Sequence, residues 1–171
     1  TKPGRPTWPY INYDAEARSE EVLALLRDAL PEMAFESAVY FTREEAEADL
    51  DDDEYDGYLV YMTAMWKGIA ELYAREKHPV MIADELYSGS GGFLRVNSMV
   101  IEEGLPVVSV ASSDFDDIVE AVRLFDVIKQ MREAKILVVA NAERGMAAKG
   151  IVEGAEEIFG TQVERIGAEE L

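Results

Sequence analysis

Residues 79–92, PVMIADELYSGSGG, decide the fold of this chain, because they join a wholly apolar run to a glycine-rich turn and then to a helix. Runs of the same kind recur at residues 37–41, 58–62, 106–110 and 135–140. Continuous apolar runs without polar alternation are typical of strands covered on both faces, and helices between them indicate parallel crossover connections. The sequence therefore predicts an α/β domain built on a three-layer, doubly wound and mainly parallel sheet of about six strands.

The two ends of the chain extend this pattern. Residues 7–13 form a candidate first strand, although Pro9 restricts it to a sheet edge or to the start of a strand. Residues 162–166 read as a last strand, after a helix that Gly160 ends. We find no linker that would split the chain, so residues 1–171 are expected to form a single α/β domain.

Two helix starts carry clear capping signals. Thr42 and Glu45 have the spacing of a capping box, in which each side chain bonds the backbone N–H of the other. Ser112, Ser113 and Asp114 precede a strongly periodic helix and are candidate caps for it. Nine acidic residues lie between positions 44 and 56, which favours a solvated helix end, since the spacing and the central glycine of a calcium-binding loop are missing.

Composition limits the class of partner. The chain has 35 acidic and 16 basic residues, a formal net charge of -19, and a field of that sign repels nucleic acid and anionic membranes. No apolar stretch approaches the roughly 20 residues needed to span a bilayer, and the N-terminus lacks a signal-like segment, so we expect a soluble, cytoplasmic protein. With no cysteine and one histidine, His78, the chain cannot assemble a thiolate metal site or a catalytic histidine pair, and His78 is expected to be structural.

Three loops follow predicted strands and could contact a ligand, because open parallel sheets bind ligands at the carboxyl ends of their strands. The first loop, residues 84–92, contains Ser88, Ser90 and Gly91. Its glycines would let backbone N–H groups turn toward an anionic or polyhydroxylated ligand. A positive φ at Gly91 is one backbone conformation that would do this. It matches neither the dinucleotide fingerprint nor the P-loop, and a plain connection is the alternative.

The other two loops are less specific. Residues 111–114 are explained by helix capping, with ligand contact as the alternative. Residues 141–150 carry Arg144 and Lys149, which could meet a ligand or a neighbouring acid in what is otherwise an ordinary loop and helix. Trp66 follows a predicted strand and could stack on a sugar ring or pack in the core. No pair of side chains reads as a nucleophile and its base, so no catalytic residue is predicted.

Two segments carry a resemblance to a known family. Residues 56–66, DGYLVYMTAMW, and the tail over residues 144–171, with RGMAAKGI and FGTQVERIGAEEL, resemble in order and spacing the N-terminal region of the L-fucose/L-arabinose isomerase superfamily. The glycine-rich loop adds to the resemblance. The residues after Trp66 and the loop over residues 88–92 depart from the fucose enzymes, which leaves the identity of the sugar open.

The resemblance implies a fold and an activity. Members of this family interconvert aldoses and ketoses with a divalent metal, usually manganese, through an enediol made by proton transfer between adjacent carbons. Their metal ligands lie in later domains, and the N-terminal domain is flavodoxin-like or Rossmann-like and helps to wall the active site of a neighbouring subunit. Trp66 would face the substrate, and Arg5 or Arg18 would match an arginine of the N-terminal segment.

Two hypotheses follow. In the first, the chain is the N-terminal part of a longer sugar isomerase-like homo-oligomer and binds a small sugar through Trp66, Arg18, Ser88, Ser90, Gly91 and Arg144. It holds no cofactor itself, and the complete protein uses manganese. In the second, it is a stand-alone binding or regulatory module for a small phosphorylated or polyhydroxylated ligand.

Overall fold

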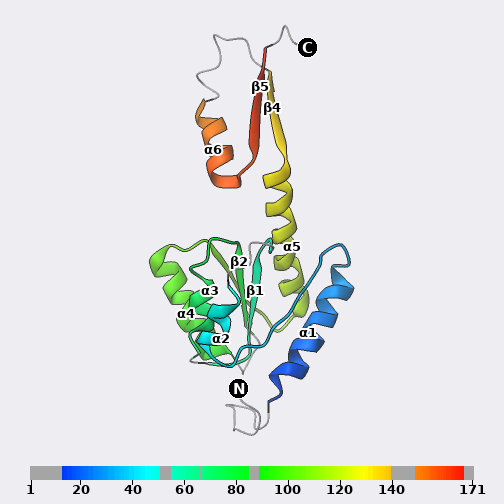
Figure 1. Cartoon of the computed structure of the whole chain (residues 1–171), viewed down its shortest axis with the longest axis vertical. Coiled ribbons are helices and arrows are strands. Elements are labelled where there is room, and N and C mark those ends of the chain that lie inside the picture. Colours follow the sequence, from blue (N-terminus) through cyan, green and yellow to red (C-terminus); the bar gives the residue numbers. More distant parts are fainter. Residues whose placement is uncertain (1–12, 51–54, 66, 85–88, 140–148, 168–171) are drawn as a thin grey trace. The chain divides into compact units, whose positions relative to one another are not determined.

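The structure is a computed structural model that describes residues 13–50, 55–65, 67–84, 89–139 and 149–167. These residues form six helices and five strands in a mixed α/β arrangement (Figure 1). The chain divides into two compact units, Thr1–Arg123 and Leu124–Leu171. Each unit contains a small open sheet of parallel strands.

The first unit is built on a three-stranded parallel sheet in the order β1-β2-β3. Its elements are α1 (Ala15–Ala29), α2 (Arg43–Ala48), β1 (Tyr58–Met62), α3 (Ile69–Tyr73), β2 (Val80–Asp84), α4 (Ser90–Glu103), β3 (Val107–Ala111) and the first part of α5 (Phe115–Glu133). The register aligns the last residues of the three strands, so that Met62 pairs with Asp84 and Asp84 with Ala111. The carboxyl ends of all three strands therefore lie at one edge of the sheet.

The second unit contains the end of α5, β4 (Lys135–Val139), α6 (Lys149–Phe159) and β5 (Gln162–Ile166). β4 and β5 pair in parallel, with Lys135 opposite Gln162. Gly160 ends α6 with a left-handed backbone (φ 69°), and its N–H donates to the Glu156 carbonyl at 3.0 Å, as predicted for a helix stop at this glycine. The buried hydroxyl of Thr161 donates to the carbonyl of Met131 at 2.8 Å, which ties the end of α5 to the turn before β5.

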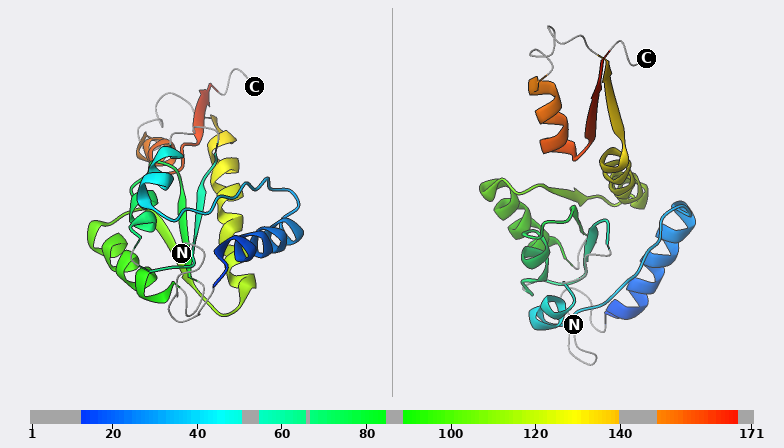
Figure 2. Two further views of the ribbon diagram at one scale, coloured as in Figure 1. Left: turned by 60° about the horizontal axis from the view of Figure 1, so that its bottom comes forward. Right: turned by 45° about the horizontal axis from the view of Figure 1, so that its top comes forward.

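One face of the three-stranded sheet carries the main core. Side chains at alternate strand positions point to the same face, so Val80, Ile82 and Asp84 share a face of β2. Helices α3 and α4 cover this face (Figure 2). An ion pair between the buried Glu71 of α3 and the half-exposed Arg95 of α4 joins the two helices. The core consists of Ala46, Met62, Ala70, Tyr73, Ala74, Val80, Ile82, Phe93, Val96 and Val100.

The opposite face of the sheet is covered by α1 and the first part of α5 (Figures 1 and 2). Met81 and Ala83 of β2 point to this face and are 1% and 0% exposed. The helices contribute buried apolar side chains at helical spacing, which are Val22, Leu26, Ile118, Val119 and Val122. The prediction that a continuous apolar run is covered on both faces is thus confirmed for β2, in which every residue is buried.

Both predicted capping signals are confirmed. The Glu45 backbone N–H donates to Thr42 Oγ1 at 3.2 Å, and the Thr42 N–H donates to Glu45 Oε2 at 3.2 Å, which completes the capping box of α2. At the start of α5, the Asp116 N–H donates to Asp114 Oδ1 at 3.1 Å. Capping therefore accounts for Asp114 and favours the structural interpretation of residues 111–114.

The prediction of a strand at residues 37–41 is wrong. Within the described part of the chain this segment makes no ladder with another strand, and Ser37 and Ala38 are exposed. The end of this segment contributes to the N-terminal cap of α2 instead, because the Phe41 N–H donates to Glu45 Oε2 at 2.8 Å. An N–H group committed to a helix cap cannot contribute to a sheet ladder.

The described residues also differ from the expected single sheet of about six strands. They form five strands in two sheets, of three and two strands, and β4 and β5 pair only with each other among the described residues. The candidate strand at residues 7–13 lies almost entirely outside the described residues. Over the ranges given above, no helix combines the length and the apolar character needed to cross a membrane.

Candidate functional site

The carboxyl edge of the β1-β2-β3 sheet is the candidate functional site. β1, β2 and β3 end there at Met62, Asp84 and Ala111, and helix α4 begins at the same edge because it follows β2 in the chain. Ligands of open parallel sheets bind outside this edge, where loops and helix N-termini converge.

Arg18 reaches this edge from α1. Its Nη2 donates to the hydroxyl of Tyr61 at 3.1 Å, its Nη1 pairs with Glu21 Oε2 at 2.7 Å, and its guanidinium carbon lies 5.8 Å from the centre of the Tyr61 ring. Tyr61 is the next-to-last residue of β1. The Arg18 side chain is 23% exposed, so a positively charged, donor-rich group is held at the end of β1 and is accessible to solvent.

Asp84 places a carboxyl group at the same edge. It is the last residue of the central strand and only 3% exposed. Burial of a carboxylate is costly, so an acidic residue that ends a fully buried strand is a candidate for binding. Asp84 was not predicted as a binding residue, although an acidic residue directly after an apolar run was a usable signal.

The glycines at the start of α4 bring this helix close to the segment after β1. A Cβ on Gly89 would lie 2.1 Å from the carbonyl oxygen of Met62, and a Cβ on Gly91 would lie 2.5 Å from Met65 Sδ. Gly91 has a helical backbone within α4 and is not one of the described glycines with positive φ, so the possibility of a left-handed Gly91 does not apply. Close packing, and not backbone freedom, explains glycine at these positions.

The structure brings some of the predicted binding residues to one edge and leaves others untested. Arg18 lies on the α1 side of the sheet, while Ser90 and Gly91 begin α4 on the other side. Ser90 is half-buried. A sheet is one strand thick, so a ligand at its edge can contact groups from both faces. Trp66, Ser88, Arg144 and Arg5 lie outside the described residues.

His78 occupies a structural position. Its ring packs edge-on against the ring of Tyr58, with 5.5 Å between the centroids, and Tyr58 packs in the same manner on Tyr73 at 5.0 Å. Edge-to-face pairs of this kind contribute to packing. His78 precedes β2, at the end of the sheet opposite the candidate site.

A tyrosine network lies beside α2 and α3. The Tyr40 hydroxyl donates to Asp49 Oδ2 at 2.5 Å. Burial, and then the hydrogen bonds to Asp49 and Tyr73, raise the pKa of Tyr40 far above its usual value of 10.0, and burial also raises the pKa of Tyr73. The folded state therefore holds these phenolic protons more tightly than the unfolded state does.

We expect the free energy of unfolding to fall as the pH rises above the unfolded tyrosine pKa of about 10. The stabilisation from the raised pKa is fully present below that pH, and it is lost as the pH climbs toward the folded pKa. Urea unfolding at pH 8 and at pH 11 measures the decrease, and Tyr40→Phe should make it smaller. An equal decrease in the variant and the wild type would contradict the assignment to Tyr40.

Within the described residues, no group of three or more His, Cys, Asp or Glu side chains lies close enough together to hold a metal ion.

No protein-family model matches the sequence, and a search among curated proteins finds no match either. The assignment of a function therefore depends on the geometry of the sheet edge and on the residues that carry the resemblance described above.

Proposed function

We propose that this chain is the ligand-binding α/β region of a sugar isomerase-like protein and that it binds a small polyhydroxylated molecule at the carboxyl edge of β1-β2-β3. The observation that carries the proposal is the guanidinium of Arg18, held at 3.1 Å on the Tyr61 hydroxyl beside the end of β1. In this proposal the complete domain has a flavodoxin-like, doubly wound arrangement, and the chain functions within a homo-oligomer.

The groups at the edge have the chemistry that sugar recognition needs. Sugar hydroxyls accept hydrogen bonds from guanidinium N–H groups such as those of Arg18, and they donate to carboxylate oxygens such as those of Asp84. The Ser90 hydroxyl can do both, and aromatic rings such as that of Tyr61 pack against the apolar faces of sugars. Proton transfer between sugar carbons, with manganese in the complete protein, is assigned to groups outside this chain, which here binds and orients the ligand.

Calorimetric titration of the chain with L-fucose and L-arabinose tests the proposal. We expect saturable binding, and we expect Arg18→Gln to weaken it by about tenfold, which corresponds to about 1.4 kcal/mol. This loss is of the size expected for a hydrogen bond that involves a charged group. Arg18→Lys should weaken binding less than Arg18→Gln, because it keeps the charge but loses the planar fork of donors.

Arg123→Gln is the matched control, since the ion pairs of Arg123 among the described residues are solvent-exposed, at 3.8 Å with Glu32 and at 3.3 Å with Glu120. It removes the same charge and should leave sugar binding unchanged. Failure of both sugars to bind below about millimolar, an affinity of about -4 kcal/mol, would refute the proposal. Binding of sugar phosphates in place of neutral sugars would favour a stand-alone regulatory module.

A further inference from the structure

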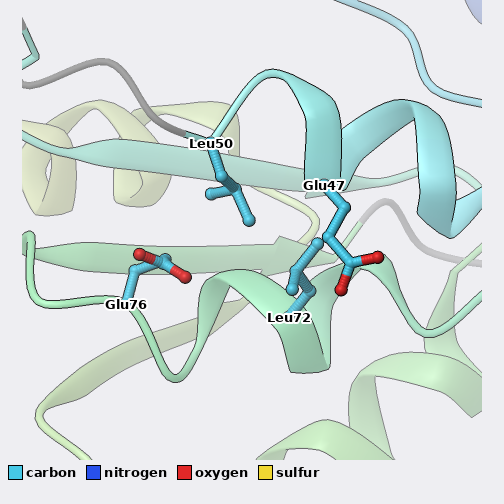
Figure 3. Close-up of a pocket in the computed structure, with 4 residues that line it drawn as sticks. All are labelled: Glu47, Leu50, Leu72 and Glu76. Atoms are coloured by element: carbon cyan, nitrogen blue, oxygen red, sulfur yellow. The ribbon is translucent and has the colours of Figure 1, made fainter.

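A pocket separate from the sheet edge lies between α2 and α3. It is open to solvent, has a volume of about 340 Å³ and is lined by Glu47, Leu50, Leu72 and Glu76 (Figure 3). Glu47 belongs to α2 and Leu50 follows that helix, whereas Leu72 belongs to α3 and Glu76 follows it.

The pocket has two apolar side chains between two acidic ones. Figure 3 shows the side chains of Leu50 and Leu72 between the carboxylates of Glu47 and Glu76. Both leucines are half-buried and also pack against the core, so their position is fixed by the fold. The lining thus combines an apolar floor with a negative charge on each side.

Among the described residues, neither Arg43 nor Arg75 forms a close ion pair with these carboxylates. Arg43 Nη2 lies 3.8 Å from Glu47 Oε1, which is a long and solvent-exposed ion pair of the kind that contributes little. Arg75, one of the two basic residues that flank Glu76 in sequence, pairs with Glu103 Oε1 at 2.5 Å and donates to the Glu71 carbonyl at 3.0 Å. Among the described residues, no ion pair of Glu76 is found.

The acidic side chains around the pocket give this region a negative potential. Asp49 and Glu76 both raise the pKa of Tyr73 through their charges, in addition to the larger effect of burial. Asp49 also accepts the hydrogen bond from Tyr40 beside α2. A chain with a net charge of -19 adds a long-range attraction for cations.

We propose that this pocket binds a linear aliphatic diamine, with one ammonium group at Glu47, the other at Glu76, and the methylene chain on Leu50 and Leu72. The diamine would contact the pocket as a lysine side chain contacts a protein surface: its alkyl chain would lie on apolar residues, and each ammonium group would pair with a carboxylate. A bare divalent cation fits less well, because two carboxylates supply too few oxygen ligands and the leucines supply none.

Titration of the chain with 1,4-diaminobutane at low salt tests this proposal. We expect one saturable site. Glu47→Gln and Glu76→Gln should each weaken binding at least fivefold, and the double variant should abolish it. Butylamine, which keeps the alkyl chain but has one ammonium group, should bind at least tenfold more weakly than the diamine.

Glu102→Gln is the matched control, because Glu102 is exposed on α4 and is not part of the pocket. It changes the net charge equally and should leave diamine binding unchanged. Equal weakening by Glu102→Gln, equal binding of butylamine, or the absence of saturation would show diffuse attraction to an acidic surface and would overturn the proposal. Arg18→Gln should not affect diamine binding, so this test is independent of the sugar proposal.

Discussion

Gly89→Ala is expected to lower the free energy of unfolding by about 3 kcal/mol. The backbone of Gly89 has φ -107° and ψ -14°, which alanine adopts without strain, so the effect is steric alone. The new Cβ would lie 2.1 Å from the oxygen and 2.8 Å from the carbon of the Met62 carbonyl, both of them backbone atoms at the end of β1. Since neither atom can turn away as a side chain would, the start of α4 must move off the sheet.

Urea unfolding followed by far-UV circular dichroism measures this loss. Gly154→Ala is the control, because it makes the same substitution within α6 where a Cβ meets nothing within 4 Å. Alanine is favoured over glycine in a helix, so Gly154→Ala should be neutral or stabilising by up to about 1 kcal/mol. An unchanged unfolding midpoint in Gly89→Ala would show that α4 does not pack against the end of β1.

Ile82→Ala is expected to cost about 3 to 4 kcal/mol of unfolding free energy. Ile82 is at the centre of β2, is 1% exposed and belongs to the core between the sheet and α4. Truncation removes buried methyl groups and leaves a cavity between the central strand and α4, whose walls are held by the parallel ladders on both sides of β2. The surrounding residues cannot easily move to fill this cavity. The loss of unfolding free energy should therefore lie in the upper part of the usual range for large-to-small substitutions.

The same urea experiment applies, with Ile101→Ala as the control. Ile101 is on α4 and is 71% exposed, so its truncation should change the unfolding free energy by less than about 0.5 kcal/mol. Similar losses in the two isoleucine variants would contradict the position of the core between the sheet and α4.

The strands were largely predictable from the sequence because their apolar runs are compact and are bounded by turn residues. β2 is the clearest case, since its continuous apolar run predicts a strand covered on both faces and all five of its residues are buried in the structure. Residues 37–41 have a similar composition but form no strand, and the backbone N–H of Phe41 at their end donates to the side chain of Glu45 instead. Composition alone does not reveal such competition for a single N–H group.

The candidate site was less predictable, because it depends on contacts between distant parts of the chain. Arg18 and Tyr61 are 43 positions apart, and no local pattern indicates that they form a hydrogen bond. Arg18 was predicted as a binding residue from the family resemblance and not from any spacing of residues in the sequence. The glycines at the start of α4 were predicted to provide backbone freedom. In the structure they allow close packing against Met62 and Met65, a contact that follows from the tertiary structure.

The pairing of neighbouring strands also has a kinetic consequence. In the described sheets each strand pairs only with the strand that precedes or follows it in the chain, as β1 with β2, β2 with β3, and β4 with β5. Every pairing step then closes a loop that contains a single crossover, which keeps the contact order low for a parallel sheet. We expect the chain to assemble progressively from its N-terminal side, so that β1 and β2 can pair while later segments are still being synthesised.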